Sequence, residues 1–253
     1  MSTLPLAMRV ESDSYPTTDP KYMSESELHR LLRTALIETL QAYYLDEPLV
    51  HVTGDLLLFY EEGNRRKHLA PDVFVAFGVG KHLRDNYLMW REAAPRVVVE
   101  LTSPSTCDDD IGGKFALYRD VLKVKEYFLF DPMGGLLTPP MQGWRLARGA
   151  YRPIREVAGR LPSRELGLHL ERGDDRRLYL WDPASGERLL SPAERAEQAR
   201  EEAEQAREEA ELAREEAEQQ ATTEAQARRE AETENARLRR LLEQAGIRVD
   251  EPK

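Results

Sequence analysis

The core of the fold is encoded in two neighbouring stretches, APDVFVAFGV (residues 70–79) and PRVVVELTSPSTCDDDIGGKFALYRDVLKVKEYFLFDP (residues 95–132). A polar connector joins them. The two stretches contain three short runs, rich in valine or phenylalanine and bounded by proline, glycine or aspartate, which is the pattern of buried strands: residues 73–77, 97–101 and 127–130. A helical pattern occupies roughly residues 109–122, between the second and third runs. A strand, a helix and a strand within about 30 residues have the size of a crossover unit.

Two carboxylates interrupt these runs. Asp72 follows a proline at the start of the first strand, and Glu100 lies inside the second, where an unpaired charge would cost several kcal/mol. On the helix, Asp110, Lys114 and Tyr118 are spaced i, i+4, i+8 and share one face. Two acids can hold a divalent cation while an ammonium orients water and offsets charge on a phosphoryl transition state. We therefore predict Asp72 and Glu100 as metal ligands and Lys114 as the water-positioning residue, supported by Asp110 and Tyr118.

A longer ordered series of residues carries a family resemblance. The series is Pro71-Asp72-Val73, Val99-Glu100, Ser103-Pro104-Ser105-Thr106, Asp110, Lys114, Tyr118, Glu126-Tyr127, Asp131-Pro132, Gly149-Ala150-Tyr151, Leu166-Gly167-Leu168 and Ser191-Pro192-Ala193-Glu194. It resembles the Uma-two family of the PD-(D/E)XK restriction-endonuclease-like proteins over roughly residues 24–195.

The resemblance implies a metal-dependent endonuclease that hydrolyses phosphodiester bonds of nucleic acid, with DNA as the expected substrate. It implies Mg²⁺ as the cofactor, with Mn²⁺ as a substitute, held by the two acids with help from the main-chain carbonyl of Leu101. The lysine of the superfamily usually stands two residues after the second acid, at the position of Thr102 in this chain. The resemblance implies that Lys114 reaches the same point from the helix, which its length allows.

The composition predicts three segments in the chain of 253 residues: a mobile lead-in (1–23), a compact domain (24–190) and a charged helix (191–253). We predict an α/β domain with a mixed central β-sheet flanked by helices, a restriction-endonuclease-like core, followed by a long C-terminal helix. The single cysteine, Cys107, excludes a disulfide framework and a multi-cysteine zinc site. No apolar run has membrane-spanning length and no signal-peptide pattern is present, so we expect a cytoplasmic protein.

Further elements are predicted around this centre. A helix begins at Ser24, which forms a capping box with Glu27. Glu38 or Gln41 on this helix could support the metal site, and a solvated helix face is the alternative for both. The remaining expectations are a strand over residues 50–60 kinked near Gly54, strands at 143–148 and 150–154, and a hairpin of 166–170 and 178–181 that completes the sheet.

Charge is distributed unevenly along the chain. The net charge is −10, and residues 191–253 contain 18 acids and 11 bases out of 46 and 36 in the whole chain. The rest is close to neutral, so attraction to a phosphate backbone would have to be local. Arg65, Arg66 and Lys67, just before Asp72, are the candidate nucleic-acid contacts, and an ordinary solvated loop is the alternative.

The C-terminal segment carries a heptad seam. Its small and apolar residues recur in steps of three and four: Ala196, Ala199, Ala203, Ala206, Ala210, Ala213, Ala217, Ala227, Ala231, Leu238, Leu241 and Ala245. Gln220, Glu224 and Glu234 break this frame. One interpretation is a weak homodimeric coiled coil that is strongest at residues 238–242, because alanine buries little area. The other is a single solvated helix supported by i, i+4 pairs of glutamate and arginine.

Two rival functions fit parts of the sequence. A non-catalytic partner-binding protein that retains a nuclease fold would suit the acidic balance and the long tail. A hydrolase of a smaller phosphoester would use the same acids. Glu100 argues against the first rival, because keeping the fold would not require an acid in a valine-rich strand.

Overall fold

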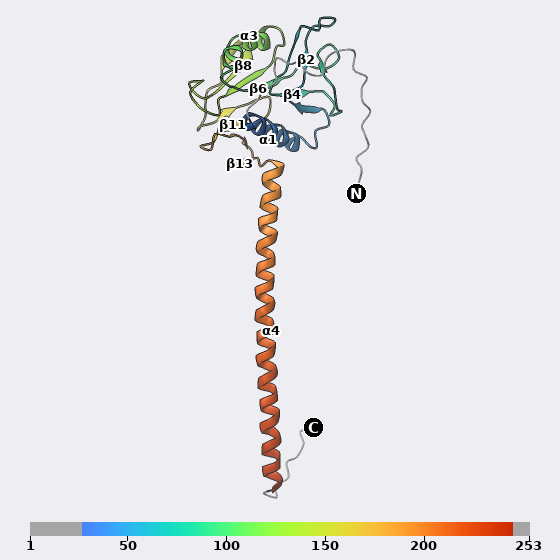
Figure 1. The fold of residues 1–253 in the computed structure, drawn as a ribbon, viewed down its shortest axis with the longest axis vertical. Helices are drawn as coiled ribbons and strands as arrows, with labels where there is room; N and C mark the ends of the chain where they lie inside the picture. Colours follow the sequence, from blue (N-terminus) through green and yellow to red (C-terminus); the bar gives the residue numbers. More distant parts are fainter. Residues whose placement is uncertain (1–26, 245–253) are drawn as a thin grey trace. The chain divides into compact units, whose positions relative to one another are not determined.

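The computed structural model describes residues 27–244 (Figure 1). The predicted lead-in at residues 1–23 and the predicted helix start at Ser24 lie outside the described residues. Contacts within the chain separate into two units between Ala193 and Glu194. The segment boundaries drawn from the sequence stay predictions.

The first unit consists of short strands and three helices within the described residues. They are α1 (Glu27–Tyr43), β1 (Val50–Thr53), β2 (Leu58–Phe59), β3 (His68–Leu69), β4 (Val73–Phe77), β5 (Tyr87–Leu88), β6 (Val97–Leu101), α2 (Cys107–Ile111), α3 (Gly113–Asp120), β7 (Glu126–Phe130), β8 (Met141–Ala147), β9 (Ala150–Pro153), β10 (Leu161–Pro162), β11 (His169–Arg172), β12 (Leu178–Asp182) and β13 (Glu187–Arg188).

The central sheet of this unit is mixed. Its six strands follow the order β1-β4-β6-β7-β8-β9. Strands β6 and β7 are parallel, with Val97 opposite Glu126, and every other neighbouring pair is antiparallel. Helices α2 and α3 connect the two parallel strands, so the predicted crossover unit is confirmed, as is the α/β fold class.

Side chains of the central strands alternate between two buried layers. Val97 and Val99 pack with Leu36 and Leu40 of α1 on one face, whereas Val98 packs with Tyr118 of α3 on the other. Figure 1 accordingly shows α1 and α3 on opposite sides of β4 and β6. Each buried leucine or valine contributes roughly 1.5–3 kcal/mol. Glu100 follows the same alternation and therefore points toward α3.

The single kinked strand predicted over residues 50–60 is wrong. The segment forms β1 in the central sheet and β2 in a separate sheet of order β3-β2-β5. A Cβ atom on Gly54 would lie 1.8 Å from the main-chain oxygen of Asp72, so only glycine allows this approach. Asp55 then turns the chain with a φ of 51°. The end of β1 is thereby fixed against Asp72.

The helical stretch predicted at roughly residues 109–122 consists of two helices, α2 and α3, because the helix breaks at Gly112. The φ and ψ of Gly112 are −116° and −88°, which lie outside the helical region. A Cβ atom on Gly113 would lie 2.4 Å from Oδ1 of Asp109. Asp110 ends up on α2 and Lys114 on α3, yet the two remain in contact across the break.

The hairpin predicted to complete the sheet forms a sheet of its own. Strands β11 and β12 pair antiparallel as expected, but they belong to a four-stranded sheet of order β10-β11-β12-β13. The outer strands β10 and β13 were not predicted, because they are two residues long and lack an alternating pattern. Leu170 and Leu180 of this sheet join the same core layer as α1.

The second unit is helical. Helix α4 (Pro192–Gln244) has 53 residues, and none of its residues is buried. No helix among residues 27–244 combines the length and the apolarity needed to cross a membrane.

Candidate active site

Three elements bring the predicted acids and lysine together. Asp72 immediately precedes β4, and Glu100 is the fourth of the five residues of β6, which neighbours β4 in the sheet. Lys114 lies in the first turn of α3, on the face of the sheet toward which Glu100 points. The antiparallel strands β4 and β6 thus carry the two acids, and the crossover helix α3 carries the lysine.

The two carboxylates are linked through the backbone of each other's strand. The main-chain N–H of Asp72 donates to Oε2 of Glu100 at 3.2 Å, and the N–H of Leu101 donates to Oδ2 of Asp72 at 2.7 Å. These reciprocal bonds fix both side chains at the ends of β4 and β6.

Lys114 connects the second acid to the helix. Its Nζ lies 3.2 Å from Oε2 of Glu100 and 2.9 Å from Oδ1 of Asp110. Tyr118, one turn later on the same face, donates from its hydroxyl to Oε1 of Glu100 at 2.5 Å. The main-chain oxygen of Asp110 in turn accepts from the hydroxyl of Tyr127 at 3.0 Å. Of the predicted supporting residues, Asp110 thus contacts Lys114 and Tyr118 contacts Glu100.

Burial and neighbouring charges set the protonation of the cluster. Burial raises the pKa of Glu100 to about 8, although the Lys114 ammonium opposes this shift. Burial also acts to raise the pKa of Asp72, but the His29 hydrogen bond and charge, with the Lys114 charge, hold it below its usual range. Burial would lower the pKa of Lys114, and the Glu100 and Asp110 carboxyls outweigh this effect and raise it. Asp72 is therefore ionised and Lys114 charged at neutral pH, whereas Glu100 holds its proton more readily than an ordinary glutamate.

His29 was not predicted from the sequence, and the structure places it against Asp72. Its Nε2 lies 3.0 Å from Oδ1 of Asp72, and the residue is 7% exposed. The signal was present, because His29 occupies the buried helical stripe that continues through Leu32, Leu36 and Leu40. A polar residue on such a stripe needs a partner. The partner, 43 positions later in the chain, was not apparent from local pattern.

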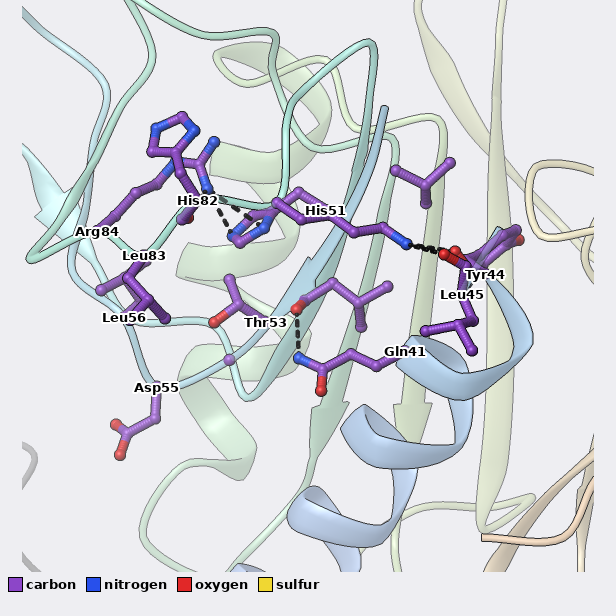
Figure 2. Close-up of a pocket in the computed structure, with 14 residues that line it drawn as sticks. Gln41, Tyr44, Leu45, His51, Thr53, Asp55, Leu56, His82, Leu83 and Arg84 are labelled. Atoms are coloured by element: carbon purple, nitrogen blue, oxygen red, sulfur yellow. Dashed lines mark hydrogen bonds between the residues drawn. The ribbon is translucent and has the colours of Figure 1, made fainter. Parts of the chain in front are cut away.

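The two candidate residues of α1 lie elsewhere. Glu38 is exposed and stands nine positions after His29, which is half a turn around the helix and about 14 Å along it. Gln41 donates from Nε2 to the main-chain oxygen of Val52 at 2.9 Å. Figure 2 shows Gln41 beside β1, where it lines a pocket of about 400 Å³. Neither residue is in the cluster, and His29 takes the place expected for them.

Two positively charged side chains, Arg84 and Lys81, line the pocket beside β1, and both are bonded to other groups of the protein. Arg84 Nε donates to both carboxylate oxygens of Glu92 at 2.7 Å, and its NH1 and NH2 groups donate to the main-chain oxygens of His82 and Gly80. Lys81 Nζ donates to the main-chain oxygens of Tyr44 and Leu45, just after α1. These cations serve to fix the loop after β4 to α1 and β1.

The predicted nucleic-acid contacts lie in the turn between β2 and β3. Arg65, Arg66 and Lys67 are all exposed there. Nδ1 of His68 lies 2.9 Å from the main-chain oxygen of Arg65, which stabilises the turn. Their role toward nucleic acid stays a prediction.

The donor set of the cluster suits a hard divalent cation. Mg²⁺ prefers oxygen ligands and is commonly held by one or two carboxylates, with water filling the other positions. Asp72 has a side chain that is 14% exposed, whereas that of Glu100 is 1% exposed, so an ion can approach from the Asp72 side. Among residues 27–244 no group of three His, Cys, Asp or Glu residues is arranged to hold a metal. An ion here would rest on the two carboxylates, water and the Leu101 carbonyl, which stays a predicted ligand.

A family model and a solved structure are similar to this chain. The model of the Uma2 family, described as "Putative restriction endonuclease", matches residues 21–174. A crystal structure of a "putative nuclease" from Anabaena variabilis ATCC 29413 aligns with a TM-score of 0.43 at 15% identity, covering 58% of this chain and 79% of that one. No curated protein matches the chain. The family match extends over more than half of the chain and includes Asp72, Glu100 and Lys114, and the chain therefore belongs to the Uma2 family of restriction-endonuclease-like proteins.

Proposed function

We propose that this protein is a Mg²⁺-dependent endonuclease of the PD-(D/E)XK type that hydrolyses phosphodiester bonds in DNA. One observation carries the proposal: Asp72, Glu100 and Lys114, which come from three elements, form one bonded cluster. A buried cluster of two acids and an ammonium is costly for the fold, which is expected where chemistry needs it. DNA rather than RNA as the substrate rests on the family description alone, because the basic turn before Asp72 would suit either nucleic acid.

Each residue has a distinct role in the proposed reaction. Asp72 and Glu100 bind the cation through their carboxylate oxygens. A bound Mg²⁺ would supply Lewis-acid stabilisation of the charge that develops on the phosphoryl group. Lys114 holds the attacking water and remains protonated, because its pKa is raised by Glu100 and Asp110. It therefore acts as a hydrogen-bond donor and a fixed positive charge rather than as a general base.

His29 fixes the orientation of the first acid in this scheme. His29 Nε2 lies 3.0 Å from Oδ1 of Asp72 as an ion-pair contact, and Oδ2 accepts from the N–H of Leu101. A second lone pair on each oxygen remains for a cation. We infer that His29 preorganises the Asp72 carboxylate for binding a metal ion.

Replacing His29 by alanine is expected to weaken Mn²⁺ binding about 10- to 100-fold, the usual effect of losing a partner that orients a metal ligand. His29→Asn, which keeps a donor, should retain more of the affinity than His29→Ala. Calorimetric titration with Mn²⁺ is the measurement, and Arg30→Ala on the exposed side of α1 is the control. Equal affinities in all four proteins would remove His29 from the site.

The affinity of the site for metal is expected to rise with pH. Glu100 has a pKa raised to about 8, and a cation binds its ionised form, so binding releases a proton below that pH. The affinity for Mn²⁺ should increase up to about tenfold per pH unit between pH 6 and 8 and level off above it. Titrations in two buffers of different ionisation enthalpy measure the released proton directly. An affinity that is constant from pH 6 to 9 would contradict the role of Glu100.

The substrate class is tested with nucleic acids of matched length. Supercoiled plasmid DNA and an RNA transcript, each with Mg²⁺, Mn²⁺ or Ca²⁺, separate the alternatives. We expect DNA to be nicked with Mg²⁺ and Mn²⁺, and Ca²⁺ to bind without supporting turnover because its coordination is looser. Cleavage of RNA alone would overturn the DNA assignment and leave the metal site intact.

A further inference from the structure

Helix α4 (Pro192–Gln244) begins with a seven-residue repeat, which polar residues at Gln220, Glu224 and Glu234 interrupt further along. Its first three heptads read AEQAREE (196–202), AEQAREE (203–209) and AELAREE (210–216). With the first alanine of each heptad as position a, alanines occupy a and d, an arginine occupies e and a glutamate occupies g. The helix is continuous through all three heptads, and its residues are solvent-exposed apart from a few near its ends.

The charges beside the seam are sorted by side. Position e carries Arg200, Arg207 and Arg214, and position g carries Glu202, Glu209 and Glu216. Each arginine has glutamates three or four residues away on its own helix, as in the 2.9 Å contact of Arg214 with Glu218. The glutamates at g have no lysine or arginine at those distances. Within the helix, position g is thus an acidic row without a basic row to meet it.

We propose that α4 pairs with α4 of a second copy of this chain, in parallel and in register. In that arrangement position g of one helix meets position e of the next heptad on its partner. Glu202 would meet Arg207, and Glu209 would meet Arg214, in both directions across the pair. An antiparallel pair would instead bring g to g and e to e, which sets glutamate against glutamate and arginine against arginine. An arginine has five donors, so it can hold its own-helix partner and the new one.

Two exposed leucines select the same arrangement independently of charge. Leu238 and Leu241 fall at positions a and d of the same frame and are 47% and 51% exposed. A parallel, in-register pair covers each leucine with its own copy. An antiparallel pair of helices about 80 Å long would set them against the alanine end of the partner. The alanine seam alone would not decide this question, because it buries little area in either direction.

The pairing has a consequence for the first unit, which precedes α4 in the chain. A parallel pair attaches both copies of that unit to the same end of the coiled coil. If the proposed nuclease function holds, on which only this consequence rests, one dimer carries two tethered sites.

Cysteine cross-linking tests the register. In a Cys107→Ser background of the full chain, Ala206→Cys places a thiol at position d, and Glu208→Cys places one at the outer position f of the same heptad. Mild oxidation should give a disulfide dimer for Ala206→Cys and at most a small fraction of it for Glu208→Cys, because the bond needs Cα atoms within about 7 Å. Equal cross-linking of both, or of neither, would overturn the parallel register.

Charge exchange tests the pairing without any reference to activity. One variant carries Arg207→Glu and Arg214→Glu, and the other carries Glu202→Arg and Glu209→Arg. Each alone should dissociate at least about tenfold more readily than the wild type, and an equimolar mixture should regain dimers. Sedimentation equilibrium over a concentration series is the measurement. A wild type that is monomeric throughout, leaving α4 to solvent or to a helix of another protein, would overturn the proposal, as would variants that dimerise as the wild type does.

Discussion

Glu100→Gln is expected to abolish Mg²⁺-dependent cleavage, by about 10³-fold or more, while leaving the protein at least as stable as the wild type. The glutamine keeps the shape and can still accept from Tyr118, but it cannot carry the negative charge that a cation needs. Because burial raises the pKa of Glu100 to about 8, ionising the wild-type residue opposes folding rather than supporting it. A residue that the fold would be better without is the signature of a site kept for function.

The sign of this effect can be followed with pH. The unfolded chain loses the Glu100 proton near its ordinary pKa of 4.5, whereas the folded chain holds it to about 8. Between these values the unfolded state binds fewer protons, so this residue makes wild-type stability fall as pH rises. The melting temperature of Glu100→Gln should match that of the wild type near pH 5 and exceed it increasingly toward pH 8.

Glu126 provides the matched control. It is also a fully buried glutamate, on the neighbouring strand β7, but its carboxylate accepts from Arg145, from Ser163 and from two main-chain N–H groups. Glu126→Gln should therefore lose stability and keep the cleavage rate of each folded molecule. If both variants lost activity and stability together, Glu100 would be a structural residue.

Lys114→Met is expected to lower the cleavage rate about 10²- to 10³-fold, because the site loses its fixed positive charge. It leaves Glu100 and Asp110 buried without a cation, so stability at pH 8 should fall by about 3 kcal/mol. Burial raises the pKa of both carboxyls, so they become protonated as pH falls, and the deficit should shrink toward pH 5. Denaturant unfolding at the two pH values measures it.

Lys125→Met is the control for this variant, because Lys125 is an exposed lysine just beyond the same helix. It should change neither cleavage nor stability by a measurable amount. Unchanged cleavage by Lys114→Met would exclude Lys114 as the lysine of the site.

The strands around the site could be predicted because short apolar runs in the local sequence indicate buried strands. Valine and phenylalanine runs ended by proline, glycine or aspartate placed β4, β6 and most of β7 correctly. The same pattern exposed Glu100, because an acid inside such a run has no local explanation. The spacing of Asp110, Lys114 and Tyr118 survived the break at Gly112, since the two helices continue on one side of the sheet.

The errors came from contacts between distant parts of the chain. Gly54 was predicted to kink one strand. It separates β1 from β2 instead, because it packs against the backbone of Asp72, 18 positions later in the chain. His29 was assigned no role because its partner lies in another element. The hairpin of β11 and β12 was predicted to join the central sheet but forms a sheet with β10 and β13. A strand pattern predicts a hairpin but not the sheet to which it belongs.

The most direct test of the proposed site is the nicking of supercoiled plasmid DNA by the wild type and Asp72→Asn, purified side by side. Both are incubated with Mg²⁺, with Ca²⁺ and with a chelator. We expect the wild type to nick the plasmid with Mg²⁺ only, and Asp72→Asn to leave it intact under all three conditions while remaining folded. Equal nicking by both proteins, or nicking by the wild type in the chelator, would contradict a metal-dependent site built on Asp72, Glu100 and Lys114.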